Sequence, residues 1–274
     1  MPVSTIRPAA VAGTFYPAEP EALKTQLDGF LREAADPCME NPMVAPKALI
    51  VPHAGYIYSG PVAASAYVRL LPWSGQIQRV ILIGPSHRIP FEGLATSRMD
   101  FFATPLGNVP IDRKLVGELL SLSQVIELDE AHRREHSLEV QLPFLQTVLD
   151  GFSLVPLVFG QTCAEAIAEV LEQAWGDEKT LIVVSSDLSH CHDYPEALEM
   201  DRQAARAIEQ GAPGDLRHDQ ACGQLAIQAL LLAAKRHGLR PALLDLRNSG
   251  DTAGSKDRVV GYGSFEFRPA SNLG

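Results

Sequence analysis

Three short apolar runs in the chain are each followed at once by titratable side chains. Continuous apolar runs of this length are typical of strands buried on both faces of a parallel sheet. The runs are KALIVP before His53, RVILIGPS before His87, and TLIVVSS before Asp187, Ser189 and His190. Because the carboxyl ends of parallel strands meet at one edge of an open α/β sheet, we expect these side chains to face one crevice.

Helical spacing alternates with strand-like runs, which predicts an α/β fold with a central, mostly parallel or mixed sheet flanked by helices. We expect one domain over residues 1–274. The predicted helices cover residues 20–35, 113–122, 164–174, 195–210 and 219–237, with others starting near Ser59 and Ser137, and further strands cover residues 153–159, 241–248 and 258–267. The Pro-rich stretch 37–46 is expected to end the first helix. Residues 93–112 contain short strands around a turn, which we expect to add to the sheet in antiparallel fashion.

The charge and hydropathy of the chain argue against two classes of partner. It has 23 Lys and Arg against 33 Asp and Glu, and this formal net charge of −10 disfavours nucleic acid and anionic membrane surfaces. The apolar stretch 225–234 is shorter than the roughly 20 residues of a membrane helix. The N-terminal residues lack a basic start and an apolar segment, so we expect a cytoplasmic protein. The four cysteines form no CxxC pair, which argues against a disulfide framework or a zinc finger.

Histidines at strand ends are the main candidates for chemistry. A single loop histidine usually bonds a backbone carbonyl, but His53 and His87 both follow a predicted strand and both have Pro and Gly nearby in the sequence. Two such positions together favour a site. We prefer His190 to His192 as a third candidate, because the group from Asp187 to His190 lies nearest to the strand end.

Two more histidines, His132 and His136, lie four residues apart in the charged segment DEAHRREH. This spacing resembles a metal-binding pair on one helix face. The charged surroundings favour a solvated face for His132. His136 is the better candidate for the site, because it directly precedes the expected helix start and lies three residues from Glu139.

Cys222 differs from the other cysteines in its position. If Asp219 caps the predicted helix, Cys222 falls in its first turn, where the helix dipole favours a thiolate. The alternative is a buried thiol that acts as a small hydrophobe. Two histidines and one anionic ligand leave open positions on a metal, and that ligand could be Cys222, Asp187 or Glu139. A thiolate would favour copper or zinc, and a carboxylate would favour ferrous iron.

Seven segments, spread over nearly the whole chain, carry a family resemblance. They are RPAAVAGTFYP, VPHAGYIYSG, GPSHR, EHSLEVQLPFL, SSDLSH, DQACGQLAI and VVGYGSFEF. With these segments in this order the chain resembles the Memo family. Prokaryotic proteins of this type are also described as protein B of the AmmeMemoRadiSam system, and this implies a functional link to a radical-SAM protein. The resemblance makes residues 1–274 a single Memo-like domain.

The resemblance implies an α/β fold similar to that of the class III extradiol dioxygenases, which are non-haem iron enzymes. It implies that His53, His87 and Cys222 bind one metal ion, iron or copper, with zinc as a further metal in the purified protein. Asp187 and His190 would line the same pocket. The dioxygenases use a carboxylate where this chain offers Cys222, and this departure puts ring cleavage in doubt.

Three functions compete at this point. The first is a metal-dependent redox or oxygenase-like protein, acting on a small molecule or a peptide, in which His190 acts as acid or base, Asp187 orients it and His136 assists. The second is a non-catalytic module that binds a peptide or small anion through the histidines and the loop 249–256. The third is a hydrolase with Cys222 as nucleophile, His190 as its base and Asp187 as the residue that orients the base. We rank them in this order.

Overall fold

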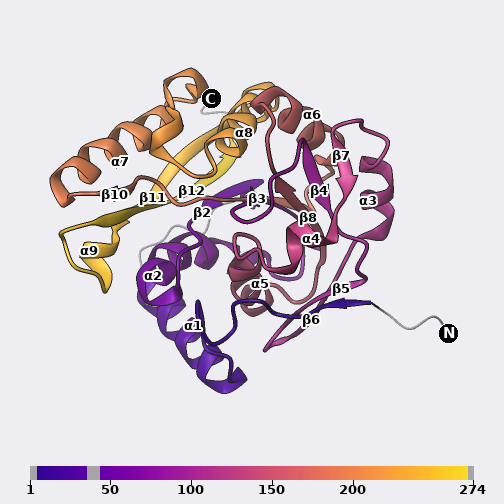
Figure 1. Ribbon diagram of the computed structural model, residues 1–274, viewed down its shortest axis with the longest axis horizontal. Coiled ribbons are helices and arrows are strands. Elements are labelled where there is room, and N and C mark those ends of the chain that lie inside the picture. Colours follow the sequence, from indigo (N-terminus) through magenta and orange to yellow (C-terminus); the bar gives the residue numbers. More distant parts are fainter. Residues whose placement is uncertain (1–4, 36–43, 271–274) are drawn as a thin grey trace.

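The computed structural model describes residues 5–35 and 44–270, and a nine-stranded mixed sheet forms its centre (Figure 1). Four neighbouring strands in this sheet run parallel to one another. In spatial order they are β2 (Ala48–Val51), β9 (Thr180–Ser185), β3 (Arg79–Pro85) and β8 (Ser153–Phe159). Nearly all their residues are buried, as expected for strands covered on both faces. The prediction that the three apolar runs form parallel strands ending at one edge is therefore confirmed.

The rest of the sheet comes mainly from the C-terminal part of the chain. The strand order is β10-β12-β2-β9-β3-β8-β4-β7, with β11 also paired to β12. The added strands are β4 (Leu94–Thr96), β7 (Val125–Glu127), β10 (His190–His192), β11 (Leu239–Asn248) and β12 (Val259–Pro269). Strand β12 pairs antiparallel with β2, β10 and β11, so the end of the chain completes the sheet beside the first parallel strand.

A second, smaller sheet corrects one prediction. Strands β5 (Phe101–Thr104) and β6 (Gly107–Pro110) form an antiparallel hairpin, but the hairpin pairs with β1 (Ile6–Arg7) and not with the main sheet. Of the strands in residues 93–112, β4 alone joins the main sheet, where it pairs antiparallel with β8. At this pairing the Arg7 guanidinium packs over the ring of Phe102, 4.9 Å from its centroid, which adds a side-chain contact between β1 and the hairpin.

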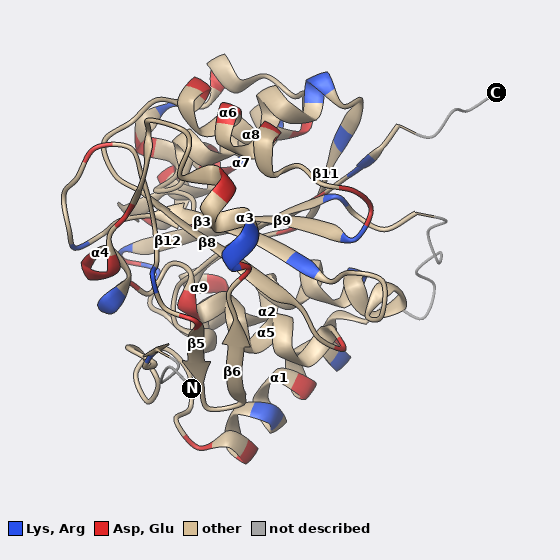
Figure 2. Cartoon of the chain, turned by 90° about the vertical axis from the view of Figure 1, so that its right-hand side faces the viewer, with Lys and Arg blue, Asp and Glu red and all other residues tan. Residues whose placement is uncertain are grey.

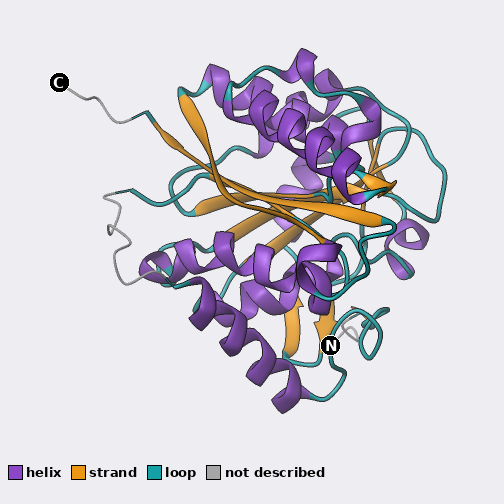
Figure 3. Ribbon diagram, turned by 90° about the vertical axis from the view of Figure 1, so that its left-hand side faces the viewer, coloured by secondary structure: helices purple, strands orange, loops and turns teal. Residues whose placement is uncertain are grey.

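Helices cover both faces of the main sheet (Figure 3). Helices α1, α2 and α5 lie on one side, and α6, α7 and α8 lie on the other (Figure 1). The bounds are α1 Pro20–Ala34, α2 Tyr56–Tyr67, α3 Arg113–Leu119, α4 Asp129–Arg133, α5 Leu142–Val148, α6 Ala164–Ala174, α7 Tyr194–Glu209, α8 Gln224–Arg236 and α9 Ser249–Thr252. Charged residues of both signs lie mostly on helices and loops (Figure 2). No helix within the described ranges is long and apolar enough to cross a membrane.

Three predicted helix starts, those of α2, α8 and α5, are wrong by about a turn. Helix α2 begins at Tyr56 and not near Ser59, since Gly55 is its N-terminal cap, and Pro61 therefore lies inside it. Helix α8 begins at Gln224, because residues 218–220 form a separate 3-10 turn that contains Asp219. Asp219 therefore does not cap α8. Most of the Pro-rich stretch, residues 37–43, lies outside the described residues.

The helix expected at Ser137 also starts later. Residues 139–141 form a 3-10 turn, and α5 follows from Leu142 with Pro143 in its first turn, where a missing N–H is tolerated. Ser137 does not cap a helix because its hydroxyl donates to the carbonyl oxygen of Pro85 at 2.9 Å. The segment 135–141 is thus tied to the end of β3.

Candidate metal centre

Three histidines from separate segments meet at the carboxyl edge of the parallel strands. His53 follows β2, His87 follows β3, and His136 lies between α4 and the 3-10 turn. One ring nitrogen of each lies within 4.8 Å of the other two. The ring centroids are 5.2 Å apart for His53 and His87, 5.4 Å for His53 and His136, and 4.6 Å for His87 and His136. This spacing places three potential ligand atoms around one point.

His53 is buried and held from both sides. Its Nδ1 lies 2.9 Å from Ser185 Oγ, and its backbone N–H donates to Asp187 Oδ1 at 2.7 Å. Burial, together with repulsion from His87, lowers the pKa of His53 to about 3. His53 is therefore neutral near pH 7, and the neutral imidazole is the form that binds a metal.

A buried carboxylate orients His87. Glu135 Oε1 lies 2.8 Å from His87 Nδ1, and Glu135 Oε2 accepts the His87 backbone N–H at 2.6 Å. Burial opposes the charge of Glu135, but hydrogen bonds from His87 and from the Ser137 backbone outweigh it and lower the pKa of Glu135 to about 2. An ionised carboxylate only accepts hydrogen bonds, so Nδ1 of His87 carries a proton, and Nε2 is the nitrogen that the neutral ring would offer to a metal. A carboxylate in this position is common behind metal-bound histidines.

His136 completes the group and was predicted as a catalytic residue rather than a ligand. Its ring packs against Phe15, with centroids 4.7 Å apart. Its Nδ1 lies 3.2 Å from Glu135 Oε1, but the angles do not form a hydrogen bond, and this buried nitrogen has no partner among the described residues. Burial, with repulsion from His53, lowers the pKa of His136 to about 4. A neutral, unpartnered imidazole beside two others fits a metal ligand.

Cys222, predicted as the third ligand, lies beside His53 but outside the 4.8 Å group. Its Sγ is 3.3 Å from Nε2 of His53. The expected dipole effect is wrong, because Cys222 precedes the first residue of α8. Burial, and then the charge of Asp187, raise the pKa of the Cys222 thiol to about 12.

As the sequence suggested, Asp187 and His190 both follow β9: Asp187 lies in the loop after it, and His190 is the first residue of β10. No hydrogen bond joins their side chains in the part of the chain that the structure describes. Asp187 is buried, with Oδ2 4.0 Å from His53 Nε2, and burial raises its pKa. His190 is exposed, and its Nδ1 lies 2.8 Å from the Leu188 carbonyl oxygen. Leu188, and not Asp187, therefore orients the imidazole of His190.

Glu139 is not available as a ligand, which removes one of the three predicted anionic candidates. It is fully buried, and its carboxylate binds the Arg7 guanidinium at 2.7 Å. It also accepts hydrogen bonds from the backbone N–H groups of Ala10 and Val11 and from the Tyr16 hydroxyl. These donors occupy both oxygens, so Glu139 anchors the N-terminal segment instead.

The remaining candidates take structural positions. His132 is 2% exposed, contrary to the predicted solvated face, and its Nε2 lies 3.0 Å from the Ala95 carbonyl oxygen. His192 pairs with Glu196 at 3.0 Å. Part of the loop 249–256 forms the short helix α9, which packs against α2 and β12.

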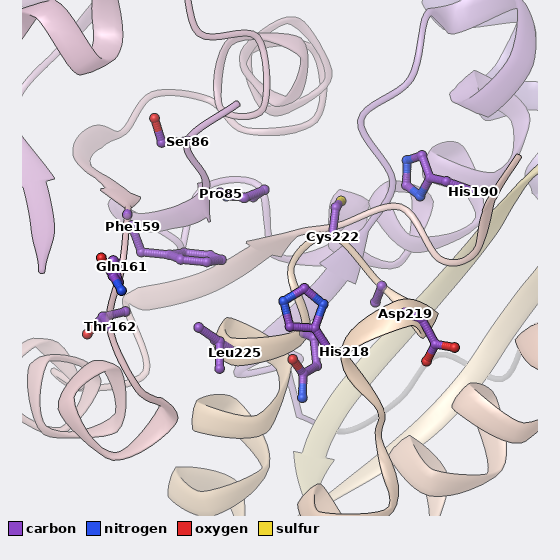
Figure 4. Close-up of a pocket in the computed structure, with 13 residues that line it drawn as sticks. Pro85, Ser86, Phe159, Gln161, Thr162, His190, His218, Asp219, Cys222 and Leu225 are labelled. Atoms are coloured by element: carbon purple, nitrogen blue, oxygen red, sulfur yellow. The ribbon is translucent and has the colours of Figure 1, made fainter. Parts of the chain in front are cut away.

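A cavity of about 620 Å³ lies beside Cys222, the neighbour of His53 (Figure 4). Cys222 and His190 line it, and Phe159 and Leu225 supply apolar wall. A second cavity, of about 480 Å³, is lined by His87 and shares the wall residues 86, 160 and 161 with the first. The second cavity therefore gives small molecules access to His87, and the first reaches Cys222 beside His53.

Sequence reasoning missed three residues behind the histidines: Glu135, Gln141 and Ser185. Gln141 Nε2 donates to Ser185 Oγ at 2.8 Å, and Ser185 Oγ donates to the Ser137 carbonyl oxygen at 2.5 Å. A partial signal was present, because the apolar run TLIVVSS ends in two serines and the segment EHSLEVQ is rich in polar residues. Buried polar side chains of this kind need partners, and here the partners are the site histidines and each other.

The fold and the site together define an α/β protein with a group of three histidines that can hold a metal ion at its strand ends. A family model described as Memo-like protein matches residues 7–266. The chain therefore belongs to the Memo family.

Full-length relatives agree with this assignment. A MEMO1 family protein of Sulfolobus acidocaldarius is 36% identical over 284 residues, covering 96% of this chain and 99% of the relative. One from Ignicoccus hospitalis is 38% identical over 284 residues, covering 96% of this chain and 98% of the relative. A solved structure of an uncharacterized protein from Escherichia coli K12 aligns with a TM-score of 0.49 and 13% identity, over 78% of this chain and 98% of that one. A similarity of that size says nothing about function.

Proposed function

We propose that this Memo-family chain is a metal-dependent redox protein that holds one iron or copper ion through His53, His87 and His136. The observation that supports it most is the convergence of three imidazole nitrogens within 4.8 Å, two of them on rings whose pKa burial lowers far below 7. Imidazole ligands suit iron, copper and zinc alike. An iron or copper ion bound there would supply one-electron redox chemistry and open coordination positions, as in the class III extradiol dioxygenases, to whose fold the Memo resemblance points.

The side chains around the group have separate tasks in this proposal. His190 lines the larger cavity, and the Leu188 carbonyl oxygen fixes its proton on Nδ1. Its Nε2 is then free to accept a proton from a molecule bound in that cavity. Asp187 holds the backbone of His53 in place through Oδ1. Phe15 covers the ring of His136 and shields that side of the group from water.

The identity of the third ligand separates two versions of the site. Three histidines form the tightest group, and Cys222 Sγ would then be a neighbour of the ion or a fourth ligand. In the version based on the sequence, His53, His87 and Cys222 bind the ion and His136 acts beside it. Thiolate ligation would favour copper or zinc over iron.

Elemental analysis of purified variants tests the proposal. We expect one equivalent of metal in the wild type and a loss of metal in His53→Ala, His87→Ala and His136→Ala. His237→Ala is the matched control, because His237 is a surface histidine paired with Glu172. Loss of metal in Cys222→Ser but not in His136→Ala would establish the thiolate version. Unchanged metal content in all three histidine variants would rule out the metal site and leave the peptide-binding or anion-binding module.

One contact favours a second candidate, the cysteine hydrolase. Cys222 Sγ lies 3.3 Å from His53 Nε2, as a nucleophile and its base would. The raised pKa of the thiol argues against it, because an activated nucleophile needs a lowered pKa. We expect iodoacetamide to alkylate Cys222 more slowly than the exposed Cys163 at pH 7.5, and preferential alkylation of Cys222 would favour the hydrolase.

A further inference from the structure

Ser185 lies at the end of β9, fully buried, and all of its hydrogen-bonding capacity is used. Its Oγ lies 2.5 Å from the Ser137 carbonyl oxygen, 2.8 Å from Gln141 Nε2 and 2.9 Å from His53 Nδ1. A serine hydroxyl has one hydrogen to donate and two lone pairs to accept. Three contacts therefore require one donation and two acceptances.

The directions of these three bonds follow from the chemistry of the partners. A carbonyl oxygen can only accept, so the hydrogen of Ser185 points to Ser137. The amide of Gln141 is fixed by two other bonds, since its Nε2 donates to the Pro52 carbonyl oxygen at 2.9 Å and its Oε1 accepts from the Tyr67 hydroxyl at 2.8 Å. Gln141 therefore presents an N–H to Ser185 and fills one lone pair. Only an N–H can occupy the other lone pair, so Nδ1 of His53 must carry a proton.

We propose that Ser185 is a positioning residue that holds His53 in its Nδ1–H tautomer and so keeps the Nε2 lone pair free for a metal ion. Without this acceptor, the proton of His53 can move to Nε2, which lies 3.3 Å from Cys222 Sγ and 4.0 Å from Asp187 Oδ2. A proton on Nε2 would occupy the lone pair that the ion needs. Ser185 thus does for His53 what Glu135 does for His87.

The inference rests on the proposed metal site for its consequence, but the tautomer itself exists without metal. One segment, residues 135–141, supplies most of the groups that orient the two imidazoles. Glu135 bonds His87, and the Ser137 carbonyl oxygen and Gln141 bond Ser185. The same segment contributes His136 as a ligand. Both imidazoles are therefore set by the same short stretch of chain. Preset ligands reduce the ordering that metal binding requires.

The test reads the tautomer directly in metal-free protein. In ¹⁵N-labelled protein at pH 7.5, long-range ¹H–¹⁵N correlation separates protonated from unprotonated ring nitrogens, and His53 is assigned by its absence in His53→Ala. We expect a single Nδ1–H form in the wild type and a mixture, or the Nε2–H form, in Ser185→Ala. We also expect Ser185→Ala to bind Cu²⁺ or Fe²⁺ about 10- to 100-fold more weakly.

Two further variants separate positioning from general damage. Ser185→Thr keeps the hydroxyl and should restore both the tautomer and the affinity. Ser264→Ala removes another fully buried strand hydroxyl, one without a hydrogen-bond partner among the described residues, and should change neither. A wild-type Nε2–H form, an unchanged tautomer or affinity in Ser185→Ala, or a Thr variant that behaves like Ala would overturn the proposal. If the wild type binds no metal, the proposed function fails, while the tautomer measurement still decides the role of Ser185.

Discussion

At the scale of single residues, the site is built from ordinary imidazoles whose behaviour is set by the atoms behind them. His87 gains its orientation from Glu135, which also accepts the backbone N–H groups of His136 and Ser137. The carboxylate is 2% exposed and remains ionised because four N–H donors surround it. Its charge should strengthen the binding of a cation by His87.

Glu135→Gln keeps the size of the side chain but removes this charge. We expect metal affinity to fall about 10- to 100-fold, because the amide makes His87 a weaker ligand and can present an N–H to it. Isothermal titration with Cu²⁺ or Zn²⁺ measures the dissociation constant. Glu127→Gln is the control, since Glu127 pairs with Arg113 at the surface, and an equal loss in both variants would contradict this role of Glu135.

All three histidines of the group could be predicted from the sequence as site residues. The role of His136 could not, since it was expected to be a catalytic residue and not a ligand. His53 and His87 stand out because each follows a predictable buried strand. His136 is less evident, since it lies between two short helical turns whose positions depend on contacts with distant segments. Glu135 and Ser185 have no sequence signal for their partners, because those partners are more than 40 residues away along the chain.

At the scale of elements, long apolar runs were predictable and short elements were not. Strands β2, β3, β8 and β9 follow from continuous apolar residues that bury on both faces. The hairpin of β5 and β6 was assigned to the wrong sheet, because its partner β1 has only two residues and is held by side chains. The anchor of β1 is Arg7, which bonds Glu139 and the carbonyl oxygens of His132 and Glu135.

Removing this anchor should cost stability. Arg7→Met leaves the carboxylate of Glu139 buried without its charge partner, and we expect the free energy of unfolding to fall by about 3–5 kcal/mol. Urea unfolding followed by circular dichroism measures it. Arg98→Met is the control, because the side chain of Arg98 is 65% exposed in its pair with Asp129, and such pairs are worth about 1 kcal/mol or less. Similar losses in the two variants would contradict the account.

At the scale of the whole molecule, three buried histidines tie stability to pH. Burial is the first cause that lowers the pKa of His53 to about 3 and those of His132 and His136 to about 4. These groups are protonated near pH 6.5 when the chain is unfolded but stay neutral in the fold. The unfolded state therefore binds more protons as the pH falls, so the contribution of these histidines to stability is complete above about pH 6.5 and is lost progressively between about pH 6.5 and pH 3.

His132 isolates this effect from the metal centre. From the shift of its pKa to about 4, we expect this one residue to lower the free energy of unfolding by about 2 kcal/mol between pH 7.5 and pH 5 in metal-free protein. His132→Gln should remove that part of the pH dependence while leaving the rest. Urea unfolding at both pH values measures the difference, and identical pH dependence in variant and wild type would contradict the buried neutral form of His132.

The central claim is that three histidines brought together by the whole fold bind one ion, and an anomalous difference map tests it most directly. The crystals would be grown from protein loaded with iron or copper, and data collected at the absorption edge of that metal. We expect one strong peak within about 2.0–2.3 Å of a ring nitrogen of each of His53, His87 and His136. A peak elsewhere, or none at this group in protein that carries a full equivalent of metal, would contradict the claim.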